Sequence, residues 1–166
     1  MATKIYQPRE TPLVWKSSGG DAAFTPTSLA TVSGRQGTYL DRGESSVARD
    51  YNWRAWIKPG GTRVVGEVVE IYLLTGETVG GSARYDNDDG TTDAAVSAYD
   101  KLRNSAFFLG VIQIDENAAV EMTKSGSIYV PQRYVAPAFW NATANTLSST
   151  AGDFGFSLTP VPDESQ

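Results

Sequence analysis

The chain has 166 residues and no histidine or cysteine, yet it carries four tryptophans, eight tyrosines, six phenylalanines and sixteen glycines. Without histidine or cysteine it cannot form the common catalytic triads, a disulfide, a redox dithiol or most zinc sites. The net charge of −5 and the pI near 4.7 argue against partners such as nucleic acid or anionic lipid, which require clustered basic residues. We therefore expect a non-enzymatic protein without a cofactor, whose aromatic residues serve packing and contacts.

The first part of the chain is rich in Pro, Thr and Gly and holds only isolated apolar residues. We predict that residues 1–27 form an extended N-terminal arm and that residues 28–166 form one folded domain. The chain begins without the apolar segment of a signal peptide, so we expect synthesis in a cytoplasm. No apolar run approaches the roughly 20 residues that a membrane helix needs.

Residues 48–58 give the strongest strand signal. Tyr51, Trp53 and Ala55 alternate with polar residues, which is the period-two pattern of a strand with one wet side. Trp56 is the exception, because it falls on the polar face. We predict a strand here whose outer face presents one tryptophan.

Further strand-sized segments are divided by turn residues. The run at residues 63–74 is β-branched on both faces and predicts a covered central strand. Pro137 predicts that the strand at residues 134–140 lies at a sheet edge or a bulge. Other predicted strands cover residues 28–32, 36–40, 106–114 (buried) and 154–158, with a hairpin of 118–124 and 127–130 around a turn at Ser125-Gly126.

One helix is predicted, over residues 93–103, with Thr92 or Asp93 as its cap. Eight to ten strands with turn signals every eight to twelve residues are typical of an all-β antiparallel sandwich or barrel. We predict a jelly-roll-like β-sandwich with this single short helix.

The segment at residues 86–93 is the best candidate for a metal site. It holds four aspartates and Asn87, and calcium prefers several oxygen ligands at short spacing. The spacing does not fit an EF-hand loop, and Asp and Asn before Gly also form ordinary turns. We assign no metal ligand and keep calcium binding as an open alternative.

Three glutamates could serve a glycoside hydrolase, since this chemistry needs only two facing carboxylates. Glu67, Glu70 and Glu121 lie on predicted strands. Acidic residues on the wet face of an antiparallel sheet are common, so we assign no catalytic residue. Asn141-Ala142-Thr143 matches a glycosylation sequon but carries little meaning without a secretory signal.

The tryptophans allow two interpretations. Trp15, Trp53, Trp56 and Trp140 could form a platform on which sugars stack, or they could be core and interface anchors. Exposed aromatic residues mark partner surfaces. We predict that a partner is contacted by Leu13, Val14, Trp15, Phe24, Trp56, Tyr134 and Trp140.

The last 65 or so residues resemble small virion structural proteins of tailed bacteriophages, of the head decoration or cement type. The resemblance rests on DKLRN at 100–104, FLGVI at 108–112, VPQRYVAP at 130–137, WNAT at 140–143 and LTPVPDE at 158–164. It implies a β-sandwich that coats the phage head and carries no active site.

We therefore expect a protein that decorates and stabilises the capsid by binding the major capsid protein and its own copies, with a trimer favoured. Its expected location is the virion surface, after synthesis in the host cytoplasm. Placement on the tail, a carbohydrate-binding role on the virion, and a carboxylate-dependent glycan hydrolase are the alternatives.

Overall fold

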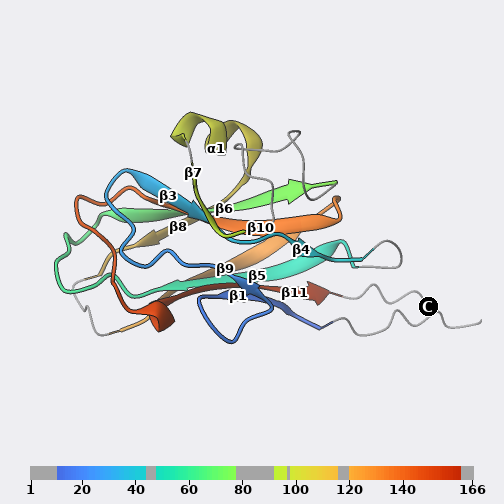
Figure 1. Cartoon of the computed structure of the whole chain (residues 1–166), viewed down its shortest axis with the longest axis horizontal. Coiled ribbons are helices and arrows are strands. Elements are labelled where there is room, and N and C mark those ends of the chain that lie inside the picture. Colours follow the sequence, from blue (N-terminus) through green and yellow to red (C-terminus); the bar gives the residue numbers. More distant parts are fainter. Residues whose placement is uncertain (1–10, 44–47, 78–91, 97, 116–119, 162–166) are drawn as a thin grey trace, which may run out of the picture.

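The computed structural model describes residues 11–43, 48–77, 92–96, 98–115 and 120–161, which form two stacked β-sheets and one short helix (Figure 1). The predicted all-β sandwich is confirmed. One sheet contains β1 (Leu13–Lys16), β2 (Ala22–Ala23), β5 (Asp50–Ile57), β9 (Met122–Tyr129) and β11 (Phe154–Val161). The other contains β3 (Ser33–Gln36), β4 (Leu40–Asp41), β6 (Val68–Gly76), β7 (Ala94–Val96), β8 (Phe107–Gln113) and β10 (Tyr134–Asn141). The helix α1 spans Tyr99–Ser105, and a 3-10 turn, η2, spans Ala151–Asp153.

The strand order is that of a jelly roll. The five-stranded sheet runs β2-β1-β11-β5-β9 and the six-stranded sheet runs β7-β3-β10-β6-β8, with β4 also paired to β10. The eight main strands in chain order are β1, β3, β5, β6, β8, β9, β10 and β11. The first, eighth, third and sixth of these are neighbours in one sheet. The second, seventh, fourth and fifth are neighbours in the other, and every such pair is antiparallel. Two interlocked Greek keys produce this order.

Aromatic side chains fill the space between the sheets. The Phe156 ring of β11 lies 5.9 Å from Trp15 on one side and 6.3 Å from Trp53 on the other, measured between ring centroids. Phe24 meets Phe139 of the facing sheet edge-on at 4.8 Å. Edge-to-face and stacked pairs of this kind stabilise by about 0.5–1.5 kcal/mol beyond simple area burial.

A second apolar layer covers the outer face of the six-stranded sheet. The helix α1 lies over this face (Figure 1), and Leu102 is its buried contact. The layer consists of Tyr39, Tyr72, Leu74, Val96, Leu102, Ala136, Ala138 and Trp140. The two central strands, β6 and β10, are therefore buried on both faces along most of their length.

The described part of the predicted arm, residues 11–27, lies inside the sandwich. β1 pairs with β11, and β2 pairs with β1. Trp15 and Phe24 are completely buried in the core, and the Trp15 indole N–H donates to the Thr38 carbonyl at 2.7 Å. These aromatic anchors find their partners within their own chain, so the fold has no break at residue 28. Residues 1–10 lie outside the described residues.

Of the sheet edge or bulge predicted from Pro137, the edge is wrong, because β10 lies between β3 and β6. The Pro137 carbonyl accepts a hydrogen bond from the Gly37 N–H at 2.9 Å. In an antiparallel strand the N–H and C=O of one residue point to the same neighbour. The missing N–H of Pro137 therefore faces the gap between β3 and β4, where the ladder is already interrupted.

Two other predicted elements are absent. Residues 28–32 form no strand, since Ser28 and Val32 have φ angles of +54° and +52°. The turn predicted at Ser125-Gly126 is part of the continuous strand β9. A Cβ at Gly126 would lie 2.9 Å from the Trp53 indole nitrogen, so this glycine leaves room for the tryptophan of the neighbouring strand.

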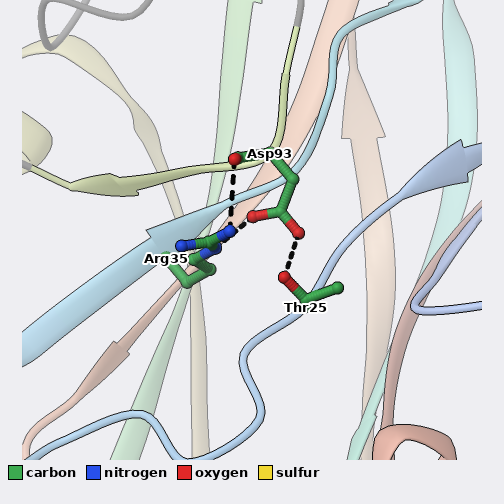
Figure 2. Close-up of polar contacts among 3 residues, drawn as sticks. All are labelled: Thr25, Arg35 and Asp93. Atoms are coloured by element: carbon green, nitrogen blue, oxygen red, sulfur yellow. Dashed lines mark hydrogen bonds and ion pairs between the residues drawn. The ribbon is translucent and has the colours of Figure 1, made fainter.

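The helix begins later than predicted, at Tyr99, and its N-cap Ala98 makes no side-chain capping bond. Asp93 instead joins three segments, because its carboxylate accepts from the Thr25 hydroxyl and pairs with Arg35 (Figure 2). The Arg35 guanidinium also donates to the Asp93 carbonyl at 3.2 Å. Residues 94–96 then pair with β3 as strand β7.

The sequon asparagine, Asn141, is a buried structural residue. Its amide nitrogen donates to the carbonyls of Leu29, Ala30 and Asn145 at 2.8–3.1 Å. Its amide oxygen accepts from the backbone N–H and the hydroxyl of Thr143. The side chain thus ties the start of β3 to the segment after β10.

We expect Asn141→Asp to lower the free energy of unfolding by about 3–5 kcal/mol, because a buried carboxylate would face three carbonyl oxygens. Asn52→Asp is the matched control: this exposed amide oxygen accepts from the Ser127 hydroxyl at 2.8 Å, and a carboxylate can do the same. Urea denaturation at pH 7 measures both, and the control should change by less than about 0.5 kcal/mol. Equal stabilities for the two variants would contradict this role.

Candidate functional site

A hollow lies at one end of the outer face of the five-stranded sheet. It has a volume of about 480 Å³, and its walls come from four separate parts of the chain. Lys16, Ser17 and Ser18 close one side after β1, and the 3-10 turn η2 closes another. We call it the Trp56 groove; it is lined by Lys16, Ser17, Ser18, Arg54, Trp56, Glu121, Ala151, Gly152 and Phe154.

Trp56 occupies the floor of this groove because the neighbouring strand leaves space for it. Gly155 of β11 lies directly opposite Trp56 of β5 in the ladder. A Cβ on Gly155 would fall 1.9 Å from the nearest indole atom, so the ring rests directly on the glycine backbone. Any larger residue at position 155 would displace the indole from the sheet.

Two cations flank the indole. The Lys16 ammonium lies 5.5 Å from the ring centroid and the Arg54 guanidinium carbon lies 5.9 Å from it. Arg54 and Trp56 are two residues apart on one strand, so they share its outer face. The Arg54 guanidinium also donates to the Glu121 carboxylate at 2.9 Å, in a solvent-exposed ion pair. The groove therefore offers an aromatic surface with two cations and one carboxylate.

The seven predicted contact residues are scattered over the molecule. Trp15 and Phe24 are in the core. Trp140 is a buried member of the second apolar layer, which we call the α1 layer, and its ring lies 4.7 Å from that of Tyr99. Leu13 packs against the core, and Tyr134 packs against the α1 layer. Val14 and Trp56 are half-buried on the five-stranded sheet. Of the seven, only Trp56 lines the groove.

The largest exposed aromatic residues lie where β8 and β9 adjoin. Phe107 is 44% exposed, Phe108 is 58% exposed, and Tyr129 at the end of β9 is 53% exposed. A shallow hollow of about 340 Å³ beside Phe107 is lined in part by Thr75, Ala106 and Pro131. We call the edge that bears Phe107, Phe108, Tyr129 and Pro131 the apolar end surface. Phe107 is paired with the core-facing Leu73 and Phe108 with the outward-facing Tyr72, so the two rings project to opposite sides of β8. The burial predicted for residues 106–114 is thus wrong at Phe107 and Phe108, because β8 is an edge strand.

Arg42 holds the backbone beneath the apolar end surface. Its buried guanidinium donates to the carbonyls of Ala48, Val130 and Gln132, and to the Tyr51 hydroxyl. Its guanidinium carbon lies 5.2 Å from the Tyr51 ring centroid. Charge-assisted bonds to several carbonyls fix the segment that follows β9. The exposed aromatic residues thus sit on a rigid support.

The three candidate acids do not gather in one site. Glu67 accepts from the Ala144 N–H at 3.0 Å, at the start of β6. Glu70 lies on the outer face of the six-stranded sheet, and Glu121 pairs with Arg54 beside the other sheet. These glutamates therefore do not form the facing pair that glycoside hydrolysis uses.

The predicted metal segment lies almost wholly outside the described residues, which include only Thr92 and Asp93 of its end. Both carboxylate oxygens of Asp93 are engaged by Thr25 and Arg35. Within the described part of the chain, no three acidic residues come together as a metal site would require. In the same part, no helix is long and apolar enough to span a membrane.

Glu70 anchors a cluster of two tyrosines under α1. The Tyr72 hydroxyl donates to one Glu70 oxygen at 2.5 Å, and the Tyr99 hydroxyl donates to the other at 2.8 Å. Burial raises the pKa of Tyr72 far above its usual value, and the bond to Glu70 adds to this rise. Burial also raises the pKa of Tyr99, again with help from Glu70. Through the hydroxyl groups of these two uncharged tyrosines, the cluster joins the helix to the sheet.

Above pH 10 we expect the free energy of unfolding to fall. A tyrosine in the unfolded chain releases its proton near pH 10, whereas the raised pKa keeps Tyr72 protonated in the folded state. The unfolded state then binds fewer protons, and each such group lowers stability by about 1.4 kcal/mol per pH unit. Tyr72→Phe should therefore show a shallower decline than the parent between pH 10 and 11.5 in urea denaturation. The exposed Tyr129→Phe serves as the control; the same decline in Tyr72→Phe as in the parent would contradict the argument.

Comparison with known proteins adds no relative from which a function could be transferred. The chain matches no model of a known protein family, and no curated protein sequence is significantly similar to it.

Proposed function

We propose that this protein is a non-enzymatic structural protein of a tailed-phage virion, which decorates and stabilises the head. In this role it binds the major capsid protein and further copies of itself, with a trimer as the favoured oligomer. It acts at the capsid surface after synthesis in the host cytoplasm. The resemblance of residues 100–164 to decoration proteins motivates the proposal.

The observation that carries the proposal is the apolar end surface. Phe107 and Phe108 project from an edge strand, and Tyr129 ends the edge strand of the other sheet. Phe108 is only partly covered by Tyr72, whose ring centroid lies 5.3 Å away. Exposed aromatic residues on a rigid framework are typical of protein contact sites. A partner that wraps around this edge would cover Phe108 on the side of Tyr72 and Phe107 on the side of Pro131.

The edge strand β8 also suits contact through side chains more than strand addition. Its pairing with β6 is irregular between Ile71 and Tyr72, where Gly110 has a φ of +149°. Such bulges twist an edge strand and reduce its capacity to pair with another chain. We therefore expect the capsid contact to depend on the aromatic side chains. Many identical contacts on a closed shell then add by avidity.

The double variant Phe107→Ser/Phe108→Ser should lose most of its binding to undecorated heads. The expected loss in affinity for a single site is about hundredfold, with about 1.4 kcal/mol from each aromatic residue. Co-sedimentation of purified protein with heads measures the binding, and electron microscopy locates the bound density. Circular dichroism verifies that the variant keeps its fold.

Val65→Ser is the matched control, because this valine is 61% exposed and lies beyond the opposite end of β8. It should bind heads as the parent does. Labelling of isolated tails by the parent protein, without labelling of heads, would overturn the head assignment. Unchanged binding of the double variant would overturn the assigned surface.

A further inference from the structure

We propose that the Trp56 groove is a binding site for an acidic saccharide. The groove lies away from the apolar end surface, and its chemistry is different, since it combines an aromatic ring with charged groups. The proposal goes beyond the capsid role and rests on different residues.

The shape of the groove fits a short oligosaccharide. Its volume of about 480 Å³ lies in the range of roughly 300–1,000 Å³ that small-molecule sites have. Trp56 is held flat on Gly155, so the ligand would meet a ring whose position is already fixed. Such preorganisation reduces the entropy lost on binding. The C–H face of a pyranose can stack on an indole held in this way.

The charges of the groove indicate an anionic ligand. Lys16 and Arg54 both lie within 6 Å of the ring centroid, although the chain as a whole carries a net charge of −5. The Arg54–Glu121 ion pair is exposed, with 57% and 39% of the two side chains accessible. An exposed pair of this kind stabilises little, so Arg54 can turn to a ligand carboxylate or sulfate at low cost. Glu121 is then free to accept hydrogen bonds from sugar hydroxyls.

A saccharide fits this combination better than an acidic peptide does. The groove lies over β1, β11 and β5, of which β11 and β5 are paired on both sides and offer no free edge for a peptide backbone. A peptide would also bring few hydroxyl donors for Glu121. A sugar acid supplies an apolar ring face, hydroxyl donors and one anion, and the groove has a partner for each.

The fluorescence of Trp56 can report the binding of a ligand. The other three tryptophans, Trp15, Trp53 and Trp140, are buried, whereas Trp56 is accessible. A ligand that stacks on Trp56 should therefore change the emission and shield it from quenching by acrylamide. The folded full-length chain is titrated with oligogalacturonate, a heparin-derived disaccharide and sialyllactose. Lactose serves as the neutral probe and hexa-aspartate as the peptide probe.

We expect at least one acidic saccharide to give a saturable emission change, with lactose bound about tenfold more weakly. Binding should weaken as NaCl rises from 50 to 500 mM, because the salt screens Lys16 and Arg54. By calorimetry, Trp56→Ala should weaken binding about tenfold, the factor expected when a stacked ring face is lost. Gly155→Ala should weaken it as well, since the added methyl group displaces the indole and removes no group that binds the ligand.

Arg54→Gln and Arg133→Gln form a matched pair of variants. Each arginine pairs with a carboxylate and lies near an aromatic ring, with 57% of the Arg54 side chain and 33% of the Arg133 side chain accessible. Arg133 bonds Asp41 at 2.6 Å and lies 5.2 Å from the Tyr134 centroid. Only Arg54→Gln should weaken saccharide binding. The absence of any effect from all three acidic saccharides would overturn the proposal. Binding of hexa-aspartate alone would also overturn it and would identify a protein contact instead.

Discussion

Burial of β6 and β10 on both faces is the constraint on which the rest of the structure depends. Their inner residues face the aromatic core, while their outer residues pack under α1 with Val96 and Leu102. The hydrogen bonds of these strands are thus shielded from water on either side. Over β6 and β10, the outer face of the six-stranded sheet is consequently occupied by the protein itself. The contacts that we propose therefore use the outer face of the other sheet and the edge where β8 and β9 adjoin.

The alternation at residues 48–58 predicts β5 almost residue by residue, together with the polar side on which Trp56 lies. Alternation reports which face a side chain occupies, but it carries no information about distant neighbours. The sequence could predict that Arg54 lies beside Trp56, because residues two apart on a strand share one face. Lys16, Glu121 and Gly155 come from other segments, and only the strand order brings them to the indole. The groove therefore could not be assembled from the sequence.

The predictions that are wrong share one physical cause: pairing with strands that are distant in sequence outweighs the local structural preference of a segment. The apolar run at 106–114 predicts burial, but β8 has one neighbour in place of two, so Phe107 and Phe108 face solvent. Residues 94–96 have helical composition, yet pairing with β3 and the Asp93–Arg35 bond hold them as a strand. The Ser125-Gly126 pair predicts a turn, but the Trp53 ring requires a residue without a side chain at position 126. None of these partners is near in sequence.

The two proposed surfaces lie toward opposite ends of the β5–β9 pair. Tyr129 is opposite Asp50 at one end of the ladder, and Thr123 is opposite Trp56 near the other. Six residues of strand separate them, which corresponds to about 20 Å at 3.3 Å per residue. A partner bound at the apolar end surface would therefore leave the Trp56 groove open. Because the core between the ends is closely packed with aromatic residues, the separation is rigid. In the roles that we propose, one subunit would hold a capsid at one end while it offers the groove at the other.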